Sequence, residues 1–209
     1  MPKPGRAPRA RLELTGVAAA IVVHFVLTRG LGIRGLDIVP ISLCVLGYAC
    51  WRGRDPEVRA EWGTRRGGLR ACAGDTLWLL GLGIAVAFAI GWYRHLLVVD
   101  LHLLLTVLLY VVWGIAQQFL VLSLFAHNLA ALGWSRPLVL VVAGVGFACI
   151  HVTNPPLVAA TAVLGPWCTL LFFRHRNLWP LGFAHGVLGA LFYRWVLGID
   201  VCAALFTAR

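Results

Sequence analysis

The sequence predicts an all-α membrane protein, a polytopic bundle of about seven transmembrane helices. Of the 209 residues, 60% are hydrophobic and only 12% are charged, and the mean hydropathy is +0.85. A water-soluble domain could not cover this much apolar surface with polar side chains. The apolar stretches have the length of membrane helices, and none of them alternates with the period of a barrel strand.

The candidate spans are each near the roughly 17–25 residues that cross a bilayer as a helix. The second and the fifth are short for this role. Residues 52–75 form the longest polar stretch, which mixes arginines and acidic residues with Gly and Pro and therefore predicts a solvated cytoplasmic loop. We expect this loop to complete an N-terminal two-helix part over 1–75, followed by a core bundle over 76–209. In chain order, the spans are 12–29, 36–51, 76–93, 101–126, 137–153, 157–173 and 177–197.

The basic residues sort by side of the membrane. The net charge of +10 comes from 18 Lys and Arg against 8 Asp and Glu. With the N-terminus in the cytoplasm, 13 of the basic residues fall on the cytoplasmic side, in agreement with the positive-inside rule. We therefore predict a multi-pass protein of a bacterial inner membrane, with the N-terminus inside and the C-terminus outside. Its basic residues are expected to contact the lipid bilayer, and no binding of nucleic acid is predicted. The five basic residues placed outside are Arg29, Arg34, Arg94, Arg194 and Arg209.

Polar side chains occur inside the rear spans, where lipid would leave them unsatisfied. Gln117 and Gln118 lie in the fourth span, and an unpaired amide in hydrocarbon costs roughly 2–7 kcal/mol. His151 ends the fifth span and His185 lies within the seventh. We expect at least one glutamine to reach one of these histidines by a hydrogen bond. Because adjacent residues differ by about 100° around a helix, only one glutamine can aim at a shared site. The other histidines are expected at the surface or the membrane interface: His24, His95, His102, His127 and His175.

Three motifs follow one another on successive spans: QQFLVLSLF at 117–125, GFACIHVTNPPL at 146–157 and NLWPLGFAHGVLGALF at 177–192. Together they resemble the CPBP family, also called the ABI family, of intramembrane CAAX proteases and bacteriocin-processing enzymes. The resemblance covers roughly residues 100–195. In that family two adjacent glutamates are followed by an arginine, the next helix carries Phe-x-x-x-His, and a further helix carries His with Asn four residues later.

The matches and the departures both fall on the expected site. Phe147 and His151 match the second motif, and His185 matches the histidine of the third. The glutamate pair, however, maps onto Gln117 and Gln118. The resemblance implies that the glutamate activates water while the histidines and the asparagine hold water or stabilise the oxyanion. Two further family positions also differ: the arginine position is Leu122 and the asparagine position is Gly189.

A glutamine amide cannot take up a proton at physiological pH, so the family mechanism cannot apply unchanged. If hydrolysis persists, one of the two histidines must be the base, which an ordinary imidazole pKa near 6.5 permits. No cofactor is predicted. A catalytic zinc normally has three protein ligands, and Cys149 is turned by about 200° from His151 on a helix. The predicted catalytic residues are Gln117, Gln118, His151 and His185, and the predicted substrate-binding residues are Phe147 and Asn154.

Two functions of different classes follow from this pattern. The first is a CPBP-type intramembrane endopeptidase with an altered active site, whose substrate is a membrane-anchored or prenylated protein tail or a sorting-signal peptide. The second is an inactive relative that binds a peptide or lipid, or assembles with another membrane protein. In the second case the glutamines only form interhelical hydrogen bonds that stabilise packing.

Overall fold

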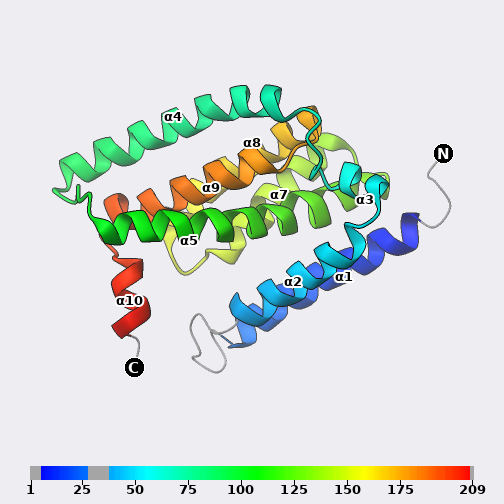
Figure 1. Ribbon diagram of the computed structural model, residues 1–209, viewed down its shortest axis with the longest axis horizontal. Helices are drawn as coiled ribbons and strands as arrows, with labels where there is room; N and C mark the ends of the chain where they lie inside the picture. The colour runs from blue at the N-terminus through cyan, green and yellow to red at the C-terminus, as the bar shows by residue number, and fades with distance from the viewer. Residues whose placement is uncertain (1–5, 28–37, 208–209) are drawn as a thin grey trace. The chain divides into compact units, whose positions relative to one another are not determined.

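The computed structural model describes residues 6–27 and 38–207, and all regular structure in these ranges is helical (Figure 1). The prediction of an all-α protein is thus confirmed for the described residues. The chain forms two compact units. Unit 1 combines residues 1–65 with 119–176, and unit 2 combines 66–118 with 177–209. The functional division into 1–75 and 76–209 stays a prediction.

Unit 1 is built around an antiparallel helix pair and a first helix that packs beside it. The pair is α7 with α8, and α1 contacts both η2 and α6. Helix starts follow the local sequence, because Asn154 accepts a hydrogen bond from the Leu157 backbone N–H and two prolines then occupy the first turn of α8. The elements are α1 (Arg6–Phe25), α2 (Ile38–Arg52), α3 (Pro56–Glu61), the π-helix η2 (Phe119–Ala126), α6 (His127–Ala131), α7 (Arg136–Ile150) and α8 (Pro155–His175).

In unit 2, α9 lies between α4 and α5 (Figure 1). The α5–α9 contact is close because glycines meet at it: a Cβ on Gly186 would lie 2.3 Å from the Tyr110 carbonyl oxygen, and one on Gly114 would lie 2.6 Å from the Gly186 nitrogen. Small residues let helix backbones approach in this way. The elements are α4 (Leu69–Tyr93), α5 (Leu101–Gln118), α9 (Trp179–Leu191), the π-helix η3 (Phe192–Val196) and α10 (Val201–Thr207).

Within residues 6–27 and 38–207, three helical stretches are long and apolar enough to cross a membrane, which is consistent with a multi-pass protein. They are α4, the continuous run Leu101–Ala131 from α5 through η2 and α6, and α8. The helix α7 is apolar but has only 15 residues. The full set of seven spans stays a prediction, and the first two predicted spans extend into residues 28–37, outside the described part of the chain.

The polar stretch 52–75 is mostly exposed, but it contains a short helix that its composition does not reveal. This helix is α3, which Asp55 caps by accepting a hydrogen bond of 2.8 Å from the Glu57 backbone N–H. Val58 and Trp62 are buried, each with 1% of its surface exposed. The Trp62 ring packs edge-on against Phe119 at 5.0 Å between centroids. A mean composition hides these two apolar side chains, which are four residues apart, and the cytoplasmic location of the loop stays a prediction.

Unit 2 also contains a cluster of charged side chains at the start of α5 and the start of α10. Arg194 bonds both Asp100 and Asp200, the latter at 2.8 Å. His102 Nδ1 lies 2.8 Å from the Asp200 carboxylate. The Asp200 carboxylate also accepts a hydrogen bond from the Ala203 backbone N–H at 2.9 Å and so caps α10. Segments about 100 residues apart in the sequence are thus joined by ion pairs.

Candidate active site

Gln118 and His185 are paired in the interior of unit 2. The last residue of α5 is Gln118, which is completely buried, and His185 lies in the middle of α9 with 7% of its surface exposed. The amide Nε2 lies 2.8 Å from the imidazole Nδ1. The prediction that a glutamine bonds one of the motif histidines is confirmed for this pair.

This hydrogen bond fixes the state of the imidazole. An amide NH2 group can only donate, so Nδ1 of His185 accepts, and in the neutral ring Nε2 carries the proton. The amide oxygen of Gln118 is buried and has no hydrogen-bond partner among the described residues. A buried acceptor without a partner is costly, so it marks a place for water or for a donor on a bound molecule.

Gln117 differs from its neighbour in burial, since its side chain is only half-buried. The two glutamines are thus unequal, as helical geometry predicts. Leu122, at the family's arginine position, is completely buried. Gly189, at the family's asparagine position, adjoins the Tyr110 ring, which a Cβ would meet at 3.0 Å. Neither position offers a polar side chain.

His151 lies in unit 1 and is held by its own helix end. It caps α7 at the C-terminus, and its Nδ1–H donates to the Phe147 carbonyl at 2.9 Å. The buried Phe147 ring packs edge-on against the imidazole at 5.2 Å between centroids. Because Nδ1 carries the proton, Nε2 of the neutral ring is an acceptor. His151 and His185 are therefore held as opposite tautomers, each by a hydrogen bond within its own unit.

The two predicted substrate-binding residues have structural contacts in unit 1. Asn154 donates its backbone N–H to the His151 carbonyl at 2.8 Å, and its side-chain oxygen caps α8. Phe147 is 2% exposed and positions His151. Contact of either residue with a substrate stays a prediction.

An apolar cavity of about 420 Å³ lies between α7 and α8 in unit 1. Its wall includes Cys149 and Val152, the sequence neighbours of His151, and Pro166 from inside α8. Pro166 approaches so closely that a Cβ on Gly144 would lie 2.5 Å from its ring. The cavity has the size of small-ligand sites, and its lining can bind only apolar groups.

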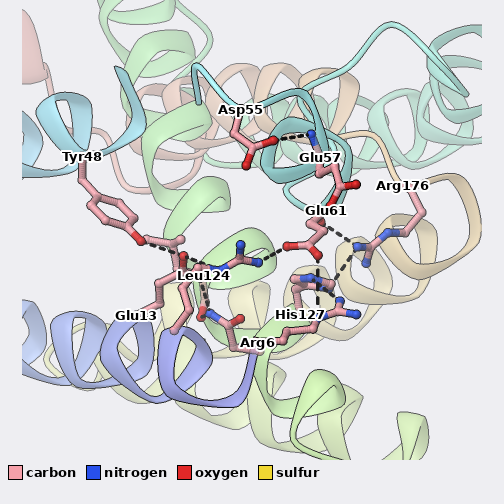
Figure 2. Close-up of polar contacts among 11 residues, drawn as sticks. Arg6, Glu13, Tyr48, Asp55, Glu57, Glu61, Leu124, His127 and Arg176 are labelled. Atoms are coloured by element: carbon pink, nitrogen blue, oxygen red, sulfur yellow. Dashed lines mark hydrogen bonds and ion pairs between the residues drawn. The ribbon is translucent and has the colours of Figure 1, made fainter. Parts of the chain in front are cut away.

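Two buried polar groups in unit 1 were not singled out by the sequence pattern. Glu13 of α1 is 4% exposed, and its carboxylate accepts from the Tyr48 hydroxyl at 2.7 Å and from the Asn128 amide at 2.6 Å (Figure 2). His127 is 5% exposed and contacts Arg6 and Arg176. His127 is therefore not at the protein surface, and its place at the membrane interface stays a prediction. The signal for both was available, because Glu13 and His127 fall inside or at the end of apolar stretches where a polar group requires a partner.

No group of three or more His, Cys, Asp or Glu side chains that could hold a metal ion occurs in the part of the chain that the structure describes. An amide holds His185 and a backbone carbonyl holds His151. Such groups orient water and substrate and do not form the usual ligand set of zinc.

Comparison with known families adds to this geometry. Residues 99–191 match the Rce1-like family model, described as Type II CAAX prenyl endopeptidase Rce1-like. This stretch, somewhat less than half of the chain, is similar to an Rce1-like domain. It includes both glutamines and both motif histidines, and it coincides with the region of the CPBP resemblance in the sequence. Searches of curated proteins and of solved structures find no significant match to the chain.

Proposed function

We propose that this protein is an intramembrane endopeptidase of the CPBP type with an altered active site. The observation that carries the proposal is the buried pair of Gln118 and His185, at 2.8 Å, inside the Rce1-like domain. Its unpaired amide oxygen supplies an acceptor where the family places its water-activating glutamate. The proposal places the protein in a bacterial inner membrane, with the N-terminus in the cytoplasm.

The tautomers support different proposed roles for the two histidines. His151 presents an acceptor at Nε2 and is the proposed general base, which takes a proton from water as the water oxygen attacks the peptide carbonyl. His185 presents Nε2–H and is the proposed donor to the resulting oxyanion. The protonated His151 then gives its proton to the leaving amine. One water is consumed, and one carboxylic acid and one amine are formed.

The glutamines support this chemistry without exchanging protons. Gln118 keeps His185 in the donating tautomer, and its free oxygen orients the attacking water or a substrate N–H. Gln117 is the proposed second contact to the substrate carbonyl. Phe147 and Asn154, both in unit 1, are the proposed substrate-binding residues.

The proposed substrate is a membrane-anchored or prenylated protein tail, or a sorting-signal peptide. The matching family is described as a family of prenyl endopeptidases. The apolar cavity of about 420 Å³ between α7 and α8 also supports a lipid-bearing substrate. An isoprenoid chain is wholly apolar and needs a lining of this kind.

The decisive experiment compares glutamine and alanine at the two histidines. The assay follows cleavage of a farnesylated fluorogenic peptide by the full chain in proteoliposomes. Glutamine can donate a hydrogen bond but cannot serve as a base, so His151→Gln should abolish turnover as fully as His151→Ala. His185→Ala should lower the turnover number by a factor of about 10²–10³, whereas His185→Gln should recover part of that loss.

The exposed His95 provides the control. Its backbone has a positive φ of 55°, which asparagine tolerates, so His95→Asn should cleave at the wild-type rate. Full activity in His151→Ala or in His185→Ala would contradict the proposed roles.

The second candidate is an inactive relative that binds a peptide or lipid or assembles with another membrane protein. The observation that favours it is the glutamine pair itself, which removes the family's base. A wild-type chain that is photocrosslinked by a farnesylated peptide but never cleaves one would establish this alternative.

A further inference from the structure

A cationic cavity of about 360 Å³ lies in unit 1, separate from the motif residues. Its wall contains Arg6 of α1, Arg136 of α7 and Arg176 at the end of α8, with His127 and Phe173. No carboxylate of a described residue is among those that line it. Figure 2 shows the Arg6 and Arg176 side chains converging on His127. Three guanidinium groups around one small space create a positive potential that favours an anion.

The cavity has more hydrogen-bond donors than acceptors. Arg6 Nη2 lies 3.1 Å from Nε2 of His127, and Arg176 Nη2 lies 3.0 Å from Nδ1 of the same ring. An imidazole accepts at most one hydrogen bond in any protonation state that occurs in proteins. One of the two arginines therefore lacks an acceptor at His127, and Arg176 Nη2 has a second acceptor in the Glu61 backbone carbonyl at 2.6 Å. Arg6 is then the arginine that is short of an acceptor. An anion in the cavity would provide it.

Two further observations point in the same direction. The Arg6 Nε is buried without a hydrogen-bond partner, and its nearest carboxylate oxygen, on Glu61, is 3.8 Å away. The Glu61 carboxylate also forms an ion pair with Arg9. Arg136 is exposed and stacks near the Phe173 ring at 5.9 Å, and no ion pair joins it to an acid among the described residues. Burial, followed by the charges of neighbouring arginines, lowers the pKa of Arg176 to about 10, so it remains charged at neutral pH.

The helix ends indicate where the anion comes from. Arg136 is the first residue of α7, and Arg176 directly follows α8, a candidate membrane span. Arg6 is the first described residue of α1. The arginine distribution predicts all three on the cytoplasmic side. Residues at the cytoplasmic end of a span lie at the depth of lipid headgroups, and basic pockets there bind acidic lipids.

We propose that this cavity binds the phosphate of an anionic phospholipid headgroup. Arg6 and Arg176 donate to the phosphate oxygens in the interior of the cavity, while Arg136 closes its exposed side. The planar guanidinium matches a phosphate in a bidentate manner, which an ammonium group does not. The site is independent of the proposed peptidase activity, because none of its residues belongs to the motif set.

The test measures lipid binding by the detergent-solubilised full chain, with native mass spectrometry as the readout. The probes are phosphatidylglycerol, phosphatidylcholine as the uncharged control, and inorganic phosphate. Arg136→Gln should weaken phosphatidylglycerol binding about fivefold, and the double variant Arg6→Gln with Arg136→Gln about 25-fold, as expected for the loss of one and two headgroup contacts. Arg136→Lys should fall between wild type and Arg136→Gln. Apart from its contact with the Phe173 ring, the Arg136 side chain forms no hydrogen bond or ion pair with a described residue, so its variants should remain folded.

A matched control removes two exposed arginines elsewhere, Arg54→Gln with Arg70→Gln, and leaves the same net charge as the double variant. It should bind phosphatidylglycerol as wild type does. Equal losses in the control and the cavity variant would overturn the proposal in favour of diffuse surface attraction. If inorganic phosphate competes at the same concentration as the lipid, the headgroup assignment is wrong and free phosphate is the ligand. Equal binding of phosphatidylcholine would overturn the anion site itself.

Discussion

Gln118 donates a hydrogen bond from its amide Nε2 to Nδ1 of His185, 2.8 Å away, across the contact of α5 with α9. Both side chains are buried, and α5 ends at Gln118 before the chain continues as the π-helix η2. Such a change of helix type in an otherwise regular span is frequent at functional sites. The bond keeps the His185 imidazole oriented within an apolar bundle, because a rotated ring would lose this hydrogen bond.

The glycines between α5 and α9 should be essential for this pair. In Gly186→Ala the new Cβ would lie 2.3 Å from the Tyr110 carbonyl oxygen and 2.4 Å from the Val111 Cα, which are backbone atoms that cannot rotate away. We expect a loss of about 1–3 kcal/mol in the free energy of unfolding, measured by thermal denaturation in detergent. Gly81→Ala in α4 has no atom within 4 Å and is the control; it should be neutral or stabilising by about 0.5–1 kcal/mol.

Much of this arrangement could be predicted from the sequence, because it depends on local rules. An amide in an apolar helix needs a partner, and few polar groups lie in the rear spans, so a bond from one of the two glutamines to His151 or His185 could be predicted, but not which pair forms it. The buried Glu13 could not be assigned in the same way. Its partners Tyr48 and Asn128 are 35 and 115 residues away, and no periodicity in one helix specifies which distant element packs against it.

The carboxylate of Glu13 should contribute strongly to the stability of unit 1. Glu13→Gln replaces an acceptor of two short hydrogen bonds by an amide that must turn one N–H toward a donor, and it removes a charge that lies 3.6 Å from Arg9. A loss of about 1–3 kcal/mol is expected for leaving a buried donor without its acceptor, since Arg9 keeps Glu61 as an ion-pair partner. The matched change Glu57→Gln, at an exposed position of α3, should stay within about 0.5 kcal/mol of wild type. Equal unfolding midpoints for the two variants would contradict this account.

Asp200 should make stability depend on pH in the acid range. The Ala203 backbone N–H, followed by His102 and Arg194, lowers the pKa of the Asp200 carboxyl from 3.8 to about 2. A carboxyl with a lowered folded-state pKa stabilises the fold above its unfolded pKa, and this contribution is lost as the pH falls through the folded value. Wild type should therefore exceed Asp200→Asn in unfolding midpoint above about pH 4, and the difference should disappear near pH 2. A constant difference across this range would show that the charge is not responsible.

The orientation in the membrane can be tested with reporters. The distribution of arginines predicts that a fusion after Arg66 is cytoplasmic and that a fusion after Arg209 is external. Arg209, with Lys3, Arg29 and Arg34 of the same pattern, lies outside the described residues. Alkaline phosphatase and green fluorescent protein fusions give opposite signals on the two sides. If both positions report the same side, the number of spans between them is even, and the seven-span assignment is wrong.

The last prediction concerns the glutamate pair that the family has and this chain lacks. In Gln118→Glu a carboxylate would face Nδ1 of His185. A carboxylate only accepts hydrogen bonds, so Nδ1 would have to carry the proton and the neutral ring would lose the Nε2–H donor. If His151 is the base and His185 the oxyanion donor, Gln118→Glu should lower turnover of a farnesylated peptide by about 10²–10³. Gln118→Ala should lower it by a similar or smaller factor, because His185 then loses its orientation but can still adopt either tautomer.

The double variant Gln117→Glu with Gln118→Glu separates this mechanism from the alternative. In a histidine-dependent peptidase it should be no faster than wild type, because the new carboxylates reverse the tautomer on which the site depends. If the wild type is inert and the double variant cleaves, the bundle is a peptidase scaffold that has lost its base, and binding is its proper function. The same His185→Ala substitution distinguishes the two cases again. It should remove activity from an active wild type, but it should leave most of any activity that the double variant gains, since the carboxylate at position 118 has already deprived the neutral His185 ring of its Nε2–H.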